Sequence, residues 1–456
     1  MENSRKSSSS NLLQRVADAL APVVPEGGSI LLGLSGGVDS VVLLHLLHQL
    51  SPRNEWRLSA LHVHHGISPQ ADAWAAFCAD LCARCDIPLQ IAQVDITPLR
   101  EMGIEAAARK LRHEALSRQP VDFIALAHHL DDQAETLLLQ LLRGAGVKGA
   151  SAMPMIKEPS PPPILLRPLL DISRSALLDY AQQHALQWVE DDSNADDAYP
   201  RNFLRHRVLP LLEQRFPAYR ETLARSARHF AEAAILLDEL AVQDANMSIH
   251  FSEGEGEPSL EVARLQTLSQ PRAKNLLRYF LATQGAPIPD STRLAEMLRQ
   301  LCHARSDAAV RITFGDWQVR CYRGKVYAFP MLPEPDTEFC APWRGEAALA
   351  LPELGGSLHF EACMGYGLSL KKLQQATVTV RLRRGAEHIR PDNKRPTRTL
   401  KNLLQEHGIP PWQRETLPLL FCGGELVCVP GVATDYAYRA QPDEAGVMVN
   451  WRSGCL

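Results

Sequence analysis

The first two hundred residues alternate short apolar runs with longer amphipathic stretches. Residues 29–35 read SILLGLS, and the following VDSVVLLHLLHQL repeats its apolar positions at helical spacing. The same succession of a predicted strand and a predicted helix occurs three more times, as RLSALHVHHG then ADAWAAFCADLCARC, PLQIAQVDI then GIEAAARKLRHEAL, and VDFIALAHH then DDQAETLLLQLLRGAG. Four strand–helix units of this length predict an α/β fold built on a doubly wound parallel sheet with right-handed crossovers.

The pattern changes after these units. One long amphipathic helix is predicted from 224 to 248, further helices follow it, and AAVRITFGDWQVRCYRGKVYAF predicts antiparallel strands. At 456 residues the chain is also too long for one ordinary core. We therefore predict a polar tail, an α/β domain, a mainly helical domain, a linker with strands and a small α+β domain, with the boundaries 1–10, 11–223, 224–336, 337–375 and 376–456.

Composition narrows the class of protein. The chain is 45% hydrophobic and 22% charged, which is typical of a soluble globular protein. Its net charge of −4 argues against indiscriminate coating of nucleic acid. The ten cysteines lack the spacing of a disulfide framework, so we expect a reducing, cytoplasmic location. With no long apolar run, we predict neither a signal peptide nor a membrane span.

The stretch SGGVDS, at residues 35–40, predicts a phosphate cradle between a strand and a helix. Gly36 and Gly37 permit backbone angles at which consecutive N–H groups converge on an anion. The helix that begins near Val38 directs its positive end to the same place. The hydroxyl groups of Ser35 and Ser40 can add hydrogen bonds. An ordinary strand-to-helix turn is the alternative.

Asp39 adds a carboxylate to this cradle, where it would repel a phosphate. A divalent cation between the two removes the repulsion, so Mg²⁺ is expected at Asp39. Because no lysine follows the glycines, the stretch is not a Walker loop. SGGVDS resembles the signature of the PP-loop family, the N-type ATP pyrophosphatases. That resemblance implies an adenine nucleotide alpha hydrolase-like fold and transfer of AMP from ATP to a substrate oxygen, with release of pyrophosphate.

One branch of this superfamily, the tRNA thiolases, uses cysteine pairs. The chain has one CxxC, at Cys82 and Cys85, and Cys78 lies one helical turn earlier. A buried face of an amphipathic helix explains this spacing better than a sulfur-transfer site. A 2-thiocytidine-type thiolase is kept as the alternative enzyme, and a tRNA-binding protein with an inactive ATPase fold as a third hypothesis.

Several further stretches resemble the tRNA(Ile)-lysidine synthetase family over nearly the whole chain. They are HVHHGISPQADAW, GIEAAARKLR, AHHLDDQAETLLLQLLRGAG, RPLLDISRSALLDYA, DDSNADDAYPRNFLRHRVLPLL, LKNLLQEHGIPPWQRETLPLL and GELVCVPGVATD. The resemblance implies a ligase that joins L-lysine to C2 of the wobble cytidine of the CAU-anticodon isoleucine tRNA. ATP is then a substrate with Mg²⁺, AMP and pyrophosphate are released, and no zinc or iron–sulfur cluster is expected. Members of the family often form dimers, so a homodimer is an expected assembly.

Two pairs of charged residues share helix faces. Asp132 and Glu135 are three residues apart, and their mutual repulsion is relieved by a bound cation. The resemblance places both at the site for lysine and metal, with Asp132 beside Asp39 at Mg²⁺ and both carboxylates among the catalytic residues. It also favours a catalytic role for Arg112 and a lysine-binding role for Arg109. As alternatives, the two carboxylates are acidic residues at the start of a helix without a functional role, and the two arginines lie on a solvated helix face.

Four histidines stand at the ends of predicted strands: His64, His65, His128 and His129. No cysteine or carboxylate at ligand spacing accompanies them, so zinc is a poor interpretation. Lining of a nucleotide pocket or simple packing is favoured. We assign His64 to the ATP site.

Two basic clusters interrupt an otherwise acidic chain. Residues 201–230 hold seven arginines against two glutamates, and residues 381–401 hold eight basic residues against two acidic ones. Such runs are often solvated surfaces, but beside a nucleotide site they favour contact with an RNA backbone. The predicted tRNA-binding residues, at the end of the catalytic domain and in the C-terminal domain, are Arg201, Asn202, Arg205, Arg383, Arg384, Lys394, Arg395 and Lys401.

Overall fold

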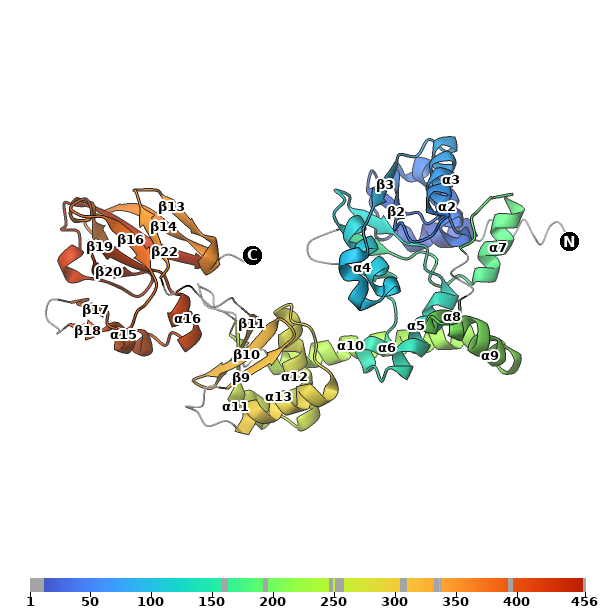
Figure 1. The fold of residues 1–456 in the computed structure, drawn as a ribbon. Helices are drawn as coiled ribbons and strands as arrows, with labels where there is room; N and C mark the ends of the chain where they lie inside the picture. The colour runs from blue at the N-terminus through green and yellow to red at the C-terminus, as the bar shows by residue number, and fades with distance from the viewer. Residues whose placement is uncertain are drawn as a thin grey trace. The chain divides into compact units, whose positions relative to one another are not determined.

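A computed structural model describes residues 12–157, 163–191, 196–245, 249–250, 258–303, 310–331, 336, 338–392 and 397–453 (Figure 1). The chain divides into two compact units between Leu237 and Asp238. Helix α10 (Tyr219–Ala245) contains both this division and the boundary expected at 223/224. The predicted tail lies outside the described residues.

The first unit contains the predicted doubly wound sheet. Its strand order is β3-β2-β1-β4-β6-β5, with β1 (Ser29–Gly33), β2 (Arg57–His64), β3 (Leu89–Gln93), β4 (Phe123–Ala125), β5 (Ile156–Lys157) and β6 (Ile164–Leu166). All neighbours pair in parallel except β5, which is antiparallel to β6. The order reverses between β1 and β4. In such sheets ligands bind beyond the carboxyl ends of the strands at this reversal.

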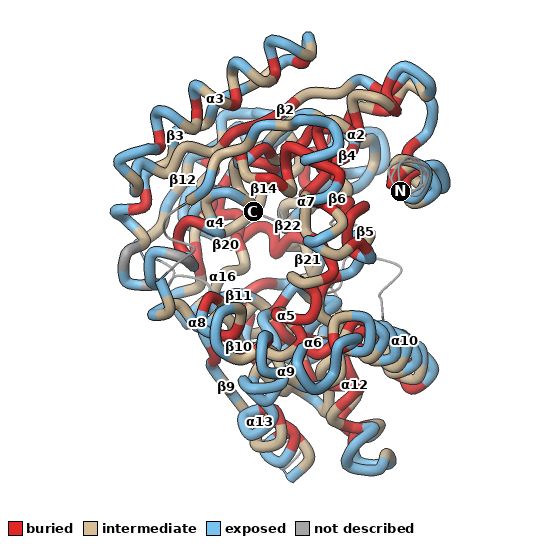
Figure 2. The backbone as a smooth tube through the Cα atoms, turned by 90° about the vertical axis from the view of Figure 1, so that its right-hand side faces the viewer, coloured by how far each residue is buried: buried red, intermediate tan, exposed pale blue. Residues whose placement is uncertain are grey.

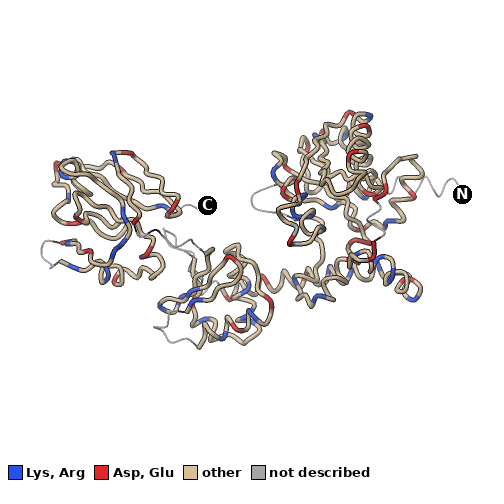
Figure 3. Tube along the Cα trace, viewed as in Figure 1, with Lys and Arg blue, Asp and Glu red and all other residues tan. Residues whose placement is uncertain are grey.

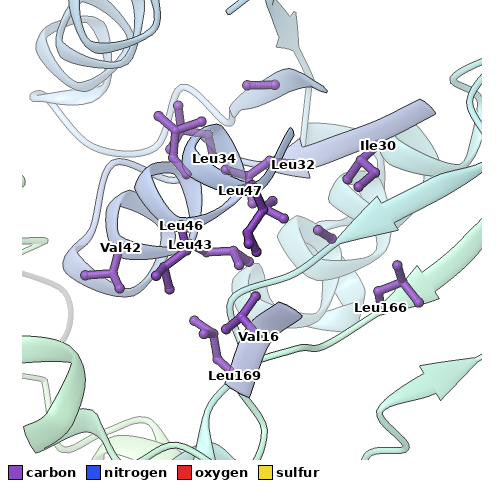
Figure 4. Packing of buried hydrophobic residues seen from close by; sticks show 14 of the residues in the cluster. Val16, Ile30, Leu32, Leu34, Val42, Leu43, Leu46, Leu47, Leu166 and Leu169 are labelled. Carbon is purple, nitrogen blue, oxygen red and sulfur yellow. The ribbon is translucent and has the colours of Figure 1, made fainter. Parts of the chain in front are cut away.

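Helices cover the sheet as the periodicity predicts. They are α2 (Val38–Asn54), α3 (Ala71–Arg84), α4 (Ile104–Ser117), α5 (Leu130–Leu142) and α7 (Arg174–Gln183), with a further helix over 12–20. Helix α2 has eight valines and leucines among its 17 residues, and its Leu43, Leu46 and Leu47 are fully buried. Figure 4 shows these side chains gathered with strand residues such as Leu32, and Figure 2 shows the same core in red around α2, β4 and β6. Each fully buried leucine contributes about 1.5–3 kcal/mol.

After the sheet, short helices lead into α10. They are α6 (Val147–Ala150), α8 (Pro200–Phe203), a π-helical turn (Leu204–Val208) and α9 (Leu209–Arg215). Pro200 stands in the first turn of α8, where its missing N–H leaves no helical hydrogen bond unmade. The π-helical turn then changes the direction in which successive side chains project, a feature common at functional sites.

The second unit begins with the predicted helices and antiparallel strands. Helices α11 (Val262–Thr267), α12 (Gln270–Thr283) and α13 (Ser291–His303) pack with a five-stranded sheet around the fully buried Phe280. The strand order is β7-β8-β11-β10-β9, with β7 (Ile249–His250), β8 (Ser259–Glu261), β9 (Arg311–Phe314), β10 (Trp317–Tyr322) and β11 (Lys325–Pro330). The start of SLEVARLQTLS, expected as helix, instead forms β8 because it pairs with β11.

The remainder of the second unit is an α+β module with two main sheets. Their orders are β12-β16-β19-β20-β21 and β13-β14-β22-β15, and a ribbon of β17 and β18 accompanies them. The strands are β12 (Cys340–Trp343), β13 (Ala348–Leu351), β14 (Gly356–Met364), β15 (Leu368–Ser369), β16 (Val378–Arg381), β17 (His388–Ile389), β18 (Arg398–Thr399), β19 (Leu419–Cys422), β20 (Glu425–Val429), β21 (Ala433–Thr434) and β22 (Ala445–Ser453). The helices are α14 (Leu370–Leu373), α15 (Leu400–Glu406) and α16 (Pro411–Thr416).

Strands from 337–375 and from 376–456 build the same two sheets, since β12 pairs with β16 and β14 with β22. A single apolar core lies between them. Within the described ranges, no helix combines the length and the apolar character needed to cross a bilayer.

Candidate active site

The phosphate loop, residues 35–40, joins β1 to α2. Gly36 has φ +87°, and a Cβ there would approach Val189 Cγ2 to 2.9 Å, so this position requires glycine. Gly37 has φ −70°, which any residue adopts, and a Cβ would meet only Ser35 Oγ at 3.6 Å. The backbone argument from the sequence therefore applies to the first glycine. At the second, the backbone N–H donates to Ser35 Oγ at 3.4 Å.

The start of helix α2 retains its positive end. No side chain caps the N-terminus at Gly37, and the helix begins at Val38 as predicted. Ser40 donates its hydroxyl to the carbonyl oxygen of Gly37 at 2.9 Å, and its Oγ lies 3.1 Å from Ser35 Oγ. Amides and hydroxyls of this kind at a helix N-terminus form an anion-binding site.

Asp39 has one carboxylate oxygen without a partner among the described residues. Its Oδ2 lies 3.6 Å from His129 Nε2, while its Oδ1 is buried and has no hydrogen-bond partner within the described chain. Mg²⁺ is typically held by one or two carboxylates together with substrate phosphates, so this single available oxygen beside the phosphate loop fits the ion. The described residues contain no group of three side chains that could hold a metal by itself.

A cluster of carboxylates and guanidinium groups lies next to Asp39. Asp132 accepts a hydrogen bond from the His129 backbone N–H at 3.0 Å, and its Oδ2 lies 3.4 Å from His129 Nε2. Arg201 donates to Asp132 at 2.7 Å and to Glu135 at 2.6 Å. Arg205 donates to Glu135 at 2.7 and 2.9 Å. The Glu135 side chain is only 1% exposed, so its charge depends on these two arginines.

Arg201 and Arg205, expected on an RNA-binding surface, thus lie on the carboxylates expected to hold lysine. They are one helical turn apart, on α8 and the π-helical turn, and both point to α5. Other arginines of the same sequence cluster are also paired: Arg207 with Asp197, Arg220 with Asp131 and Glu213, and Arg228 with Asp171. Figure 3 shows basic and acidic residues interspersed along this part of the chain. The partner carboxylates are mostly remote in sequence, so a local charge count missed them.

Opposite charges fix the protonation states within the cluster. Burial raises the pKa of Asp132, but the charges of His129 and Arg201 outweigh it and the net pKa is lowered. Burial lowers the pKa of His129, but contacts with Asp39 and Asp132 outweigh it and the net pKa is raised. An ionised Asp132 therefore faces a His129 ring that favours its proton, and this ring connects the phosphate loop to the carboxylates.

His129 gives a testable dependence of stability on pH. Its folded pKa lies above the value of 6.5 for a free ring, so the folded state binds the proton more tightly. The stabilisation from His129 is complete below pH 6.5 and is lost as the pH rises through the raised folded pKa. We expect His129→Gln to reduce the free energy of unfolding more at about pH 6 than at about pH 9. Urea denaturation of both proteins at both pH values measures this difference, and an equal deficit would contradict it.

The other predicted histidines differ from His129. Burial, followed by nearby cations, lowers the pKa of His65 and of His128 to about 4. The Nδ1 atoms of both are buried and have no partner among the described residues. Both rings are thus neutral at pH 7. His64, assigned to the ATP site, lies at the end of β2, and its Nε2 is 3.0 Å from Asp72 Oδ1.

Arg109 and Arg112 lie on α4 and are exposed. Neither has an ion-pair partner within the part of the chain that the structure describes. The charge of Arg112 contributes to the lowered pKa of His65, and that of Arg109 to the lowered pKa of His128. The charges of the two guanidinium groups thus act on histidines that follow β2 and β4.

The cysteines of α3 belong to the core. Cys78 and Cys82 are buried, and burial raises the pKa of their thiols to about 12 and about 11. A thiol at such a pKa is protonated and unreactive at pH 7. This arrangement agrees with a buried helix face and disfavours sulfur transfer at Cys82.

The remaining predicted RNA contacts are dispersed. Arg384 is half exposed and donates to Glu338 at 2.7 Å, and Arg383 lies 3.9 Å from Glu387. Lys401 is exposed on α15. Asn202 is buried and donates to the Asp196 carbonyl at 3.0 Å. Lys394 and Arg395 lie outside the described residues.

Comparison with known proteins identifies the family of the chain. Three family models match the chain: the PP-loop domain at residues 7–212, the TilS substrate binding domain at 260–327 and the TilS substrate C-terminal domain at 378–451. The tRNA(Ile)-lysidine synthase of Nitrosomonas europaea is 45% identical over 99% of this chain and 98% of that protein. The tRNA(Ile)-lysidine synthase of Aromatoleum aromaticum is 41% identical over 96% of this chain and 99% of that protein. A phosphate loop of PP-loop type and this full-length similarity together show that the chain belongs to the tRNA(Ile)-lysidine synthase family.

Proposed function

We propose that the phosphate loop and the carboxylate cluster (Asp132, Glu135, Arg201 and Arg205) are two halves of one site for lysidine formation. ATP transfers AMP to the C2 oxygen of the wobble cytidine in the CAU-anticodon isoleucine tRNA, and pyrophosphate is released. The ε-amine of L-lysine then attacks C2, and AMP leaves. The proposal rests on the position of the His129 ring between the two halves. Its Nε2 lies 3.6 Å from Asp39 Oδ2 and 3.4 Å from Asp132 Oδ2.

The phosphate loop would bind the triphosphate. The amides of Gly36 and Gly37, the N-terminus of α2 and the hydroxyls of Ser35 and Ser40 supply donors for its oxygens. The partnerless oxygen of Asp39 would hold Mg²⁺. When bound, the ion neutralises phosphate charge as pyrophosphate departs. His64 and Arg112 stay predictions for the nucleotide and the reacting base.

The carboxylate cluster would attract lysine. Asp132 and Glu135 offer negative charge to an ammonium group, and Arg201 and Arg205 hold both carboxylates in place in its absence. Because the pKa of Asp132 is lowered, this carboxylate is a poor acceptor for the proton that lysine must lose. Its role is therefore electrostatic. When lysine binds, Arg201 and Arg205 must share or release the two carboxylates. The affinity for lysine is therefore coupled to any other group that these arginines contact.

One experiment separates this function from the alternatives. The full chain is incubated with ATP, Mg²⁺, radiolabelled lysine and a CAU isoleucine tRNA transcript. We expect acid-precipitable label and pyrophosphate release that depends on the tRNA. Pyrophosphate release without lysine incorporation, together with a sulfur-dependent product, would favour the thiolase. Absence of both label and pyrophosphate release would favour a tRNA-binding protein without catalysis.

The C-terminal basic cluster gives a prediction about tRNA affinity. Reversing both charges in Arg383→Glu/Arg384→Glu places two carboxylates beside Glu387 and Glu338, so we expect weaker tRNA binding and a shallower salt dependence. AMP formation on a minimal anticodon stem-loop should persist. Filter-binding titrations at several salt concentrations measure the effect. Arg452→Glu, at an exposed position on β22, is the matched control for charge reversal. Equal affinity of the double variant and the wild type would contradict the assignment.

The assembly is a separate proposal. We retain a homodimer as the expected form in solution, and sedimentation velocity over a range of protein concentrations tests it. A single species with the mass of one chain would contradict it.

A further inference from the structure

Arg167 is a buried cation to which the proposed reaction gives no role. It follows β6 directly and is 6% exposed. Its Nη1 donates to the Pro154 carbonyl at 2.8 Å, while its Nε is buried and has no hydrogen-bond partner within the described chain. No carboxylate among the described residues forms an ion pair with it. A buried guanidinium without a counter-charge is strongly destabilising unless a ligand supplies the charge.

Arg167 lies at the ligand-binding edge of the sheet. Strand β6 runs parallel to β4, with Ala125 opposite Leu166, and Leu126 donates to the Leu166 carbonyl at 2.9 Å. The residues that follow both strands therefore leave the sheet side by side. After β4 this segment leads to His128 and on to Asp132 in α5. Arg167 is thus beside the segment that leads from β4 to His128, at the edge where such sheets bind ligands.

Arg109 accompanies Arg167. The charges of both arginines lower the pKa values of two separate rings, His113 and His128, after the effect of burial. The charge of Arg109 also lowers the pKa of Arg167, after the effect of burial, so the two cations repel each other. The carboxylate that acts on His128 is Asp132, whose Oδ1 already binds Arg201. The two cations thus remain uncompensated.

Groups of both signs consequently act on the His128 ring. Asp132 acts on it with negative charge, and Arg167, Arg201 and Arg109 act on it with positive charge. A free α-amino acid carries the complementary pair, an ammonium and a carboxylate on one small molecule. Guanidinium groups match carboxylates through paired hydrogen bonds. A diamine of the same length lacks the carboxylate and would leave Arg109 and Arg167 unpaired.

We propose that Arg167, together with Arg109, binds the α-carboxylate of the amino-acid substrate and so distinguishes lysine from diamines. This inference rests on the proposed function, because it assigns a further contact to the same lysine. It makes Arg167 a specificity-determining residue. An RNA phosphate is the competing occupant, and the experiment below distinguishes the two.

The test compares L-lysine with cadaverine, which is lysine without its carboxylate. The full chain and Arg167→Met are assayed with both compounds, each as a substrate and as a competitive inhibitor. A hydrogen bond to a charged group justifies an expected loss of roughly tenfold or more in kcat/KM for lysine. The binding constant of cadaverine should change little, so the preference for lysine should fall by the same factor. Arg118→Met, at an exposed position at the end of α4, is the control and should leave the preference unchanged.

Several outcomes would overturn the inference. Equal losses for lysine and cadaverine would indicate a structural role for Arg167, and unchanged constants for both would indicate none. A loss confined to tRNA affinity, measured by filter binding in the same variant, would assign the cations to an RNA phosphate.

Two further variants guard against misfolding. Arg167→Lys keeps the charge and should retain most of the preference for lysine. Arg109→Met should reproduce the selective loss, and an unchanged preference there would contradict the shared site. Failure of the proposed function would differ from all of these results, since the wild-type chain would then incorporate no lysine.

Discussion

Asp39→Asn is expected to abolish lysidine formation while the fold persists. Asparagine preserves the shape of the side chain and removes the charge that would hold Mg²⁺ beside the triphosphate. Stabilisation of transferring phosphates by a metal is worth several kcal/mol, so we expect a fall in turnover of roughly a thousandfold. The fold should persist, because Asp39 Oδ1 makes no hydrogen bond within the described chain that the substitution could break. The stability should fall only by the contribution of the contact between Asp39 Oδ2 and His129 Nε2, which is long at 3.6 Å.

The decisive measurement is tRNA-dependent release of pyrophosphate in a single turnover, since it reports the first chemical step alone. Thermal unfolding of the same preparation checks the fold. Asp18→Asn provides a matched control, because Asp18 is exposed and contacts only Gln14 one helical turn away among the described residues. A normal rate of pyrophosphate release in Asp39→Asn would contradict the account of the phosphate loop.

Local features of the sequence predicted the phosphate loop well. The alternation of strands and helices predicted the sheet, and the glycines and serines of the turn lie within one short stretch, although Val189, which packs against Gly36, is remote in sequence. The positive φ of Gly36 and the start of α2 at Val38 follow from residues within a few positions. Such features need no knowledge of distant contacts, which explains why the sequence sufficed for them.

Remote pairings were not predictable in the same way. The arginine-rich segment after residue 200 looked like a continuous basic surface, yet Arg201 and Arg205 neutralise carboxylates on α5. Arg167 was noticed only as the first residue of the stretch RPLLDISRSALLDYA, because its place at the edge of the sheet depends on the parallel pairing of β6 with β4. Strand β8 formed where a helix was expected, again because a distant strand pairs with it. In each case a tertiary partner overrides the local pattern.

Glu135→Gln is expected to reduce both stability and lysine affinity. Glu135 is almost fully buried and accepts hydrogen bonds from Arg201 and Arg205. Loss of its negative charge leaves Asp132 as the remaining carboxylate for both guanidinium groups. Breaking a buried ion pair by removing one partner costs about 3–5 kcal/mol. Urea denaturation measures this loss, and we expect a KM for lysine at least about tenfold higher. Stability and KM both within error of the wild type would contradict the importance of the cluster.

The double variant Glu135→Gln/Arg205→Gln separates packing from function. Removing both partners of the pair eliminates the uncompensated charge, so part of the lost stability should return, with a coupling free energy of roughly 1–3 kcal/mol. Lysine affinity should not return, because the negative charge that attracts the ammonium is still missing. Recovery of stability without recovery of KM would show that the arginines maintain a charge that lysine uses. Recovery of both would show that the cluster is only a structural ion pair. The single variant Arg205→Gln completes the double-mutant cycle.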